Sequence, residues 1–214
     1  MSVASYAQPG RASTASLFGR VMWLVAATVA VATLGVYVAR SWGGQGWFIF
    51  WLLGLGCLFG LNVANARGNT SLALGLLLAF GLLIGFSVSA TVNYYAATDP
   101  TAVRQAFGAT ALFIGGLGSA GYAVRRDLSF LYRFAFWALL ALIIAGFVLL
   151  FVHIPAAYTA WTVIGLGVFA LYTVIDFNRL RHAGQDQAIP LAASIFLDIL
   201  NVFLLFLQLF GNRN

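Results

Sequence analysis

Two aspartates, Asp176 and Asp198, lie inside long apolar segments in the last quarter of the chain. The 214 residues include only five acidic side chains, and all five are Asp. A carboxyl group inside a membrane is costly, and such groups mark ion paths, proton relays or switches. If the two groups meet, desolvation and mutual repulsion both favour the neutral form, so the pair holds one shared proton and titrates as a unit. Asp176 and Asp198 are therefore a candidate pH-sensing pair.

Polar side chains accompany both aspartates at helical spacing. Steps of four, three, four and three residues give a nearly continuous stripe around the second aspartate. The stripe consists of Ser194, Asp198, Asn201, Leu205 and Gln208. A second polar side is predicted on the preceding segment, from Tyr158, Thr162, Gly165, Tyr172, Thr173 and Asp176. Because polar stripes in lipid must face protein or water, they predict a hydrated path, lined by Ser194, Asn201, Gln208, Tyr172 and Thr173.

The composition indicates that the helices that carry these residues lie in a lipid bilayer. Hydrophobic residues make up 62% of the chain and charged residues 7%, and the mean hydropathy is +0.96. A hydrocarbon core of about 30 Å takes roughly 20 helical residues to cross. Seven apolar runs fit, bounded by charges or by Gly, Pro and Asn: 21–39, 47–64, 71–92, 106–124, 128–152, 158–177 and 188–210. The predicted fold is an all-α membrane protein with seven transmembrane helices, the fifth long enough to tilt.

The turn between the last two spans decides whether the aspartates can meet. We expect Gly184 to end the sixth helix in a left-handed cap and Pro190 to lie in the first turn of the seventh, which gives an antiparallel hairpin. At 1.5 Å rise per residue, Asp176 lies roughly 9–12 Å and Asp198 roughly 12–15 Å below the turn. Arg67, in the loop after the second span, could supply the opposing charge or could only set the topology.

The basic residues predict the orientation. All eleven are Arg, and the positive-inside rule places the richer side in the cytoplasm. Eight lie on the N-terminal side: Arg11, Arg20, Arg67, Arg125, Arg126, Arg133, Arg179 and Arg181. Three lie on the other side: Arg40, Arg104 and Arg213. We therefore expect a short cytoplasmic tail over 1–20, a single transmembrane domain over 21–212 and a C-terminus outside. Topology and anionic lipid account for the net charge of +6 without a nucleic-acid partner.

Small residues four positions apart predict close helix packing within the spans. The pairs are Gly56 and Gly60, Gly81 and Gly85, and Gly115 and Ser119. No catalytic constellation and no cofactor motif is found. An intramembrane aspartyl protease would also use two buried aspartates, but the sequences before them here, Val174-Ile175 and Phe196-Leu197, differ from the Tyr-Asp and Gly-x-Gly-Asp motifs of that family. An enzyme is therefore not expected.

Three segments resemble the Bax inhibitor-1 family, also called the TMBIM proteins. Residues 124–131 read VRRDLSFL, residues 171–180 read LYTVIDFNRL and residues 195–201 read IFLDILN. Together with the seven spans and the length, the likeness covers most of the chain. It implies a bacterial member similar to the pH-sensitive calcium leak proteins of this family, in the bacterial cytoplasmic membrane.

The resemblance also implies an architecture and roles for particular residues. Six helices would form a sandwich around a central, polar seventh helix. Asp176 and Asp198 match the di-aspartyl pH sensor of the family, and Arg67 is the best match to the arginine that latches it. The two carboxylates would bind calcium only weakly and transiently, because this ion prefers six to eight oxygen ligands.

Three functions remain open from the sequence. The first is a pH-gated calcium leak, with the lipid bilayer, calcium and protons as its partners. The second is a proton-coupled secondary transporter, although no inverted repeat is visible. The third is a non-conducting membrane protein that acts through interactions, for example in a stress response.

Overall fold

The computed structural model describes residues 9–42, 45–149, 151–152 and 154–211. In this part of the chain the backbone forms seven α-helices and three short 3₁₀ helices. The α-helices are α1 (Pro9–Val38), α2 (Trp47–Ala66), α3 (Thr70–Thr98), α4 (Pro100–Ala123), α5 (Tyr132–Leu149), α6 (Pro155–His182) and α7 (Ala188–Gly211). The 3₁₀ helices are η1 (Ala39–Ser41), η2 (Ser129–Leu131) and η3 (Gln185–Gln187). Each α-helix is long and apolar enough to cross a membrane, as the seven apolar runs predict.

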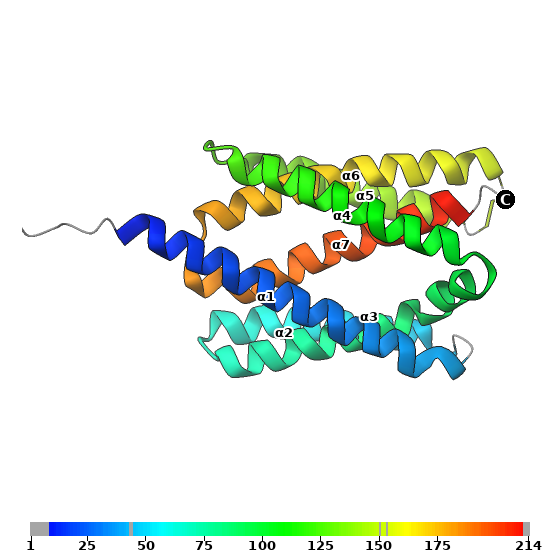
Figure 1. Ribbon diagram of the computed structural model, residues 1–214, viewed down its shortest axis with the longest axis horizontal. Helices are drawn as coiled ribbons and strands as arrows, with labels where there is room; N and C mark the ends of the chain where they lie inside the picture. Colours follow the sequence, from blue (N-terminus) through cyan, green and yellow to red (C-terminus); the bar gives the residue numbers. More distant parts are fainter. Residues whose placement is uncertain (1–8, 43–44, 150, 153, 212–214) are drawn as a thin grey trace, which may run out of the picture.

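The helices are arranged in two layers with α7 between them (Figure 1). One layer holds α1, α2 and α3, and the other holds α4, α5 and α6. Helix α7 packs against members of both layers and is the most buried of the seven. This position explains how α7 can carry polar residues in an apolar bundle, because its side chains face other helices. The predicted sandwich around a central seventh helix is confirmed.

Local signals in the sequence set several helix boundaries. Gly68 has a φ of +74°, a conformation that glycine adopts readily, and this residue turns the chain between α2 and α3. The side chain of Asn69 then accepts a hydrogen bond of 3.1 Å from the Leu72 amide and caps α3. Asp99 caps α4 in the same way, with Pro100 in its first turn. The caps provide partners for amides that have none within the helix.

The first helix begins well before the predicted span. The tail expected over 1–20 is helical from Pro9 onward, although residues 1–8 lie outside the described part of the chain. Leu17 is buried, and Ser16 accepts a hydrogen bond of 3.1 Å from Gln185 next to α7. The apolar run indicates where lipid begins, whereas tertiary contacts extend the helix beyond it.

Two further predictions about boundaries are wrong. The fifth helix ends at Leu149 and begins only at Tyr132, so it is shorter than the run 128–152 and not an overlong span. Gly184 is extended, with a φ of −87°, and not left-handed. Helix α6 ends at His182, and η3 completes the turn into α7. The hairpin still forms because the loop is short, and Pro190 lies in the first turn of α7 as predicted.

The predicted glycine seams have different outcomes. Gly81 and Gly85 of α3 pack against α1: a Cβ on Gly81 would lie 3.0 Å from the Thr28 carbonyl oxygen, and one on Gly85 would collide with that of Ala32. This seam is confirmed. A Cβ on Gly115 of α4 would meet nothing within 4 Å, and Ser119 is exposed. The predicted seam on α4 is therefore wrong, since these residues leave space where no helix packs.

Candidate functional site

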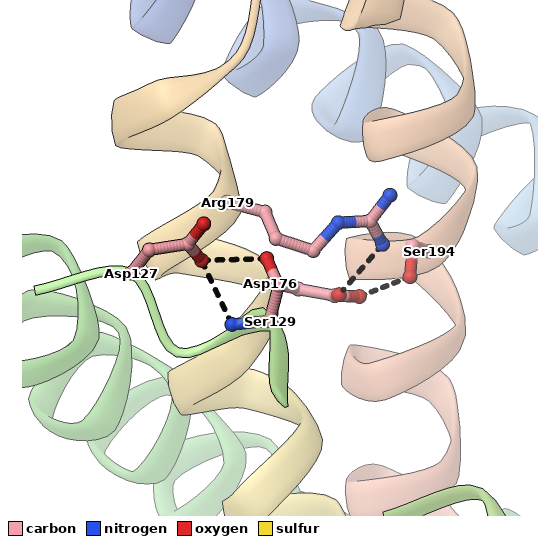
Figure 2. Close-up of polar contacts among 5 residues, drawn as sticks. All are labelled: Asp127, Ser129, Asp176, Arg179 and Ser194. Atoms are coloured by element: carbon pink, nitrogen blue, oxygen red, sulfur yellow. Dashed lines mark hydrogen bonds and ion pairs between the residues drawn. The ribbon is translucent and has the colours of Figure 1, made fainter. Parts of the chain in front are cut away.

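Asp176 lies on α6 with both carboxylate oxygens engaged (Figure 2). Its side chain is fully buried. The Arg179 guanidinium, one turn later on the same helix, forms an ion pair with Oδ1 at 3.5 Å. On the other side, the Ser194 hydroxyl of α7 donates a hydrogen bond to Oδ2. Asp176 thus links α6 to α7 through a charge-assisted hydrogen bond.

Asp198 lies one helical turn after Ser194 on α7, and it is less well satisfied. Its side chain is only 3% exposed. Among the described residues, no hydrogen-bond donor reaches its Oδ2 atom. Ser194, which bonds to Asp176, lies four residues before Asp198 on the same face of α7. The α6–α7 hairpin therefore brings the two predicted aspartates together, one with polar partners and one with a free buried oxygen.

A cavity of about 540 Å³ borders Asp198 between α2, α5, α6 and α7. Its wall includes the whole predicted stripe of α7, namely Ser194, Asp198, Asn201, Leu205 and Gln208. Tyr132 and Tyr172 line the same cavity, and most of the remaining wall is apolar. A second cavity, of about 610 Å³, shares Gln208 with the first and reaches Tyr158 and Thr162 near the start of α6. The two cavities follow α7 from Asp198 toward its C-terminal end.

The predicted polar side of α6 is divided between different environments. Tyr172 lines the cavity beside Asp198, as expected. Thr173 does not: its buried hydroxyl donates a hydrogen bond of 2.8 Å to the Phe169 carbonyl of its own helix. Consecutive residues of a helix are about 100° apart, so Tyr172 and Thr173 cannot share one narrow wall. Thr173 is therefore removed from the predicted lining.

The arginine beside the pair is Arg179 and not Arg67. Arg67 follows the last residue of α2 and is exposed, and within the described part of the chain its side chain makes no ion pair with Asp176. Arg179 could have been recognised from its spacing, because residues three apart on a helix are neighbours. Its guanidinium also lies 5.4 Å from the Tyr132 ring, which packs edge-on against Tyr172 at 5.7 Å.

Sequence reasoning also missed the residue that holds the loop between α4 and η2. Asn178 is fully buried, and its amide nitrogen donates to the carbonyl oxygens of Val124 at 2.9 Å and Arg126 at 3.1 Å. Its Oδ1 atom accepts a hydrogen bond of 2.9 Å from the Leu128 amide. One side chain of α6 thereby fixes the loop that leads to Tyr132. An asparagine in a helix carries no sequence signal for such distant backbone partners.

The same loop contains a smaller polar motif, also drawn in Figure 2. The Asp127 carboxylate accepts hydrogen bonds from the Ser129 hydroxyl at 2.6 Å and from the Ser129 amide at 2.8 Å. These bonds lower the pKa of Asp127 below its ordinary value. Asp127 is exposed and pairs locally with Ser129, so the motif shapes the loop.

The donor set limits what the site can bind. In the described part of the chain, no group of three or more His, Cys, Asp or Glu side chains lies together. The cavity offers one lining carboxylate, the amides of Asn201 and Gln208 and the tyrosine hydroxyls. These are oxygen-rich but weak ligands for a hard cation. The arrangement suits proton binding and brief cation contact.

Comparison with known proteins places this architecture in a family. The family model described as "Inhibitor of apoptosis-promoting Bax1" matches residues 14–214. An uncharacterized protein of Deinococcus radiodurans is 30% identical over 169 residues, which cover 75% of this chain and 72% of that protein. An uncharacterized membrane protein of Vibrio cholerae is 27% identical over 193 residues, covering 89% and 84%. "Inner membrane protein YbhL" of Escherichia coli is 30% identical over 149 residues, covering 64% and 62%. The chain is thus a multi-pass integral membrane protein, similar to bacterial inner-membrane proteins, and it belongs to the Bax inhibitor-1 family.

Proposed function

We propose that the protein is a pH-sensitive cation leak channel with calcium as the permeating ion, and that the protonation of Asp176 and Asp198 sets its closed–open equilibrium. The observation that carries this proposal is the position of Asp198. Its buried Oδ2 atom has no hydrogen-bond partner among the described residues, and the residue lines a cavity of about 540 Å³. A group in this position changes the charge of the cavity wall when it gains or loses a proton.

The charge balance of the pair supports a switch. Arg179 contacts Asp176, and one arginine compensates one carboxylate. The pair therefore reaches neutrality with one bound proton, and loss of that proton leaves an uncompensated charge beside an apolar wall. The Ser194 hydroxyl bond holds α6 against α7 at this point. Repulsion between the two carboxylates would weaken this contact and favour a different helix arrangement.

The weakness of the ligands supports a passive leak. An ion that passes Asp198 would next meet Asn201 and Gln208 on the same face of α7. Conduction needs sites that are weak enough to release the ion. Calcium would therefore touch the carboxylates only transiently. The excess of arginine on the predicted N-terminal side of the membrane, eight of the eleven, further supports a cytoplasmic N-terminus and an external C-terminus.

Calcium flux from reconstituted liposomes tests the proposal. Purified wild-type protein should release entrapped calcium at a rate that depends on pH. Asp176→Asn and Asp198→Asn should flatten this dependence, because each removes one titrating group of the pair. Asp186→Asn is the matched control, since it removes an exposed carboxylate from η3. Flux with the wild-type pH profile in both pair variants would refute the sensor.

The two arginines distinguish the arrangement seen here from the latch predicted by family resemblance. Arg179→Gln should move the midpoint of the flux profile to higher pH, because loss of the positive charge favours the protonated pair. This shift is smaller than for a buried arginine, since the Arg179 side chain is 34% exposed. Arg67→Gln should leave the midpoint in place. A shift of the midpoint in Arg67→Gln but not in Arg179→Gln would instead support Arg67 as the latch.

The same liposomes separate the alternatives. Accumulation of calcium against its gradient, driven by an imposed proton gradient, would identify a secondary transporter. Absence of wild-type flux at every pH, in vesicles that contain folded protein, would leave an interaction protein as the better description.

A further inference from the structure

We propose that the groove between α1 and α4 is a binding site for an anionic phospholipid, with one acyl chain in the groove and the headgroup at Arg181, beside one end. This site lies across α7 from the aspartates and does not depend on the proposed channel activity. The sequence predicts close helix packing at Gly115 and Ser119 of α4, but in the described part of the chain no helix packs there. The space beside these two residues is the groove.

The groove has the size and the lining of a hydrocarbon site. Its main part is a cavity of about 730 Å³. The lining residues of α4 are Thr110, Ala111, Ile114, Gly115, Gly118, Ser119, Tyr122 and Ala123, and those of α1 are Ala15, Phe18 and Met22. Ala123 lies thirteen positions after Thr110, which corresponds to about 20 Å of helix. This length exceeds half of a hydrocarbon core of about 30 Å, so the groove can take an acyl chain of one leaflet.

Two of the three hydroxyls that line the groove are already bonded within α4. The Thr110 hydroxyl donates a hydrogen bond of 2.7 Å to the Ala106 carbonyl, and the Ser119 hydroxyl donates one of 2.6 Å to the Gly115 carbonyl. The third, that of Tyr122, lies at the end of the groove beside Arg181, so the long middle part of the wall is apolar. A neighbouring cavity of about 260 Å³ shares Thr110 and Ala111 and is also mainly apolar. Hydrocarbon is the matching occupant.

Positive charge is concentrated at one end of the groove. The Arg181 guanidinium donates hydrogen bonds to the carbonyls of two lining residues, Tyr122 at 2.8 Å and Ala123 at 3.5 Å, and lies 5.8 Å from the Tyr122 ring. The Tyr122 ring contacts Phe18 of α1 at 5.3 Å, whereas the Arg20 guanidinium donates a hydrogen bond of 3.5 Å to Gln185, so Arg181 is the arginine at the groove. Arginine is well suited to phosphate because its planar donors can bind two oxygens. The charge at this end selects an anionic headgroup.

The two glycines of α4 provide a matched pair of variants. A Cβ at Gly115 or at Gly116 would meet nothing within 4 Å, so the backbone at both positions leaves room for a larger residue. Only Gly115 lines the groove. Gly115→Leu should fill the groove, whereas Gly116→Leu should project away from it and give the same gain in helix propensity.

Native mass spectrometry of the purified protein tests the site. The protein is equilibrated with equal amounts of phosphatidylglycerol and phosphatidylethanolamine. Wild type and Gly116→Leu should retain phosphatidylglycerol, and Gly115→Leu should lose it. The variant Arg181→Gln should still bind lipid, but its preference for phosphatidylglycerol should fall by roughly fivefold. Excess inorganic phosphate should not displace the lipid, because most of the contact is with the acyl chain.

Three results would overturn the proposal. They are equal retention of phosphatidylglycerol by wild type and folded Gly115→Leu, the absence of any headgroup preference in wild type, and a change of oligomeric state in Gly115→Leu in place of lipid loss. A second measurement needs no variant: phosphatidylglycerol with a photoreactive group in its acyl chain should label α4 between Thr110 and Tyr122. Equal labelling of the exposed residues of α5 would indicate ordinary boundary lipid and would also contradict the site.

Discussion

Replacement of Asn178 should destabilise the protein more than any other change of a single polar group outside the aspartate pair. Asn178→Ala removes hydrogen bonds of 2.9–3.1 Å to the Val124 carbonyl, the Arg126 carbonyl and the Leu128 amide, and a weaker one of 3.3 Å to the Gly121 carbonyl. At about 1 kcal/mol of net stability for each of the three shorter bonds, the expected loss is about 3 kcal/mol. The side chain is fully buried, so water cannot easily replace it.

The isosteric variant separates hydrogen bonding from packing. Asn178→Asp keeps the shape and the bond from the Leu128 amide, but it points a carboxylate oxygen at carbonyl oxygens. We expect it to lose at least as much stability as the alanine variant. Asn62→Ala is the control, because Asn62 is exposed and its amide donates only to the Leu58 carbonyl of its own helix, at 2.8 Å. This control should change stability by about 0.5 kcal/mol or less.

Reversible unfolding in mixed micelles, with an increasing mole fraction of denaturing detergent, measures these differences. Equal unfolding free energies for Asn178→Ala and Asn62→Ala, within about 0.5 kcal/mol, would contradict a stabilising role for the Asn178 hydrogen bonds. Wild-type stability of Asn178→Asp would do so too, because the donated bonds would then contribute nothing.

Two further outcomes are expected. A Cβ on Gly121 would collide with the backbone carbonyl of Val174, so Gly121→Ala should cost about 1–3 kcal/mol of stability. Gly116→Ala should cost none, because a Cβ there meets nothing within 4 Å. Equal stability of the two variants would contradict the close contact of Gly121 with Val174. The bonds from Ser129 lower the pKa of Asp127, so they stabilise the loop after α4 at pH values above the ordinary pKa of 3.8. This stabilisation is lost as the pH falls below 3.8 and through the lowered pKa. Limited proteolysis of this loop should therefore speed up in acid for wild type, and Asp127→Asn should remove that dependence while leaving cleavage elsewhere unchanged.

The number and order of the helices could be predicted from the sequence, but some of their ends could not. Apolar runs report contact with lipid, and this matched α2 and α7 closely because charges or turn residues bound those runs. Helix α1 continues toward Pro9 because Leu17 and Ser16 find tertiary partners, which a hydropathy pattern cannot show. Helix α5 stops at Leu149 although the apolar run continues, since hydrophobicity does not distinguish a helix from an irregular segment.

In the site, too, contacts within one helix could be predicted from residue spacing, whereas contacts between distant segments could not. Helical periodicity on α7 was sufficient to predict which of its residues share a wall, because one face of a single helix is a local property. Family resemblance pointed to Arg67, in the loop after α2, as the partner of Asp176, whereas the ion pair in the structure is with Arg179, three residues away on the same helix. Arg179 was the local solution. The role of Asn178 depends on a loop more than 50 positions earlier, and no local pattern contains it.

The central position of α7 explains why its opposite faces can have different chemistry. Asp198 borders the cavity between α2, α5 and α6, whereas the next residue, Ile199, lines the apolar groove between α1 and α4. A helix at the edge of the bundle would expose one of these faces to lipid, where a carboxylate is costly. Enclosure by two layers lets one face hold ionisable groups while the other borders hydrocarbon. Any movement of α7 that changes the setting of Asp198 must therefore also change the shape of the groove.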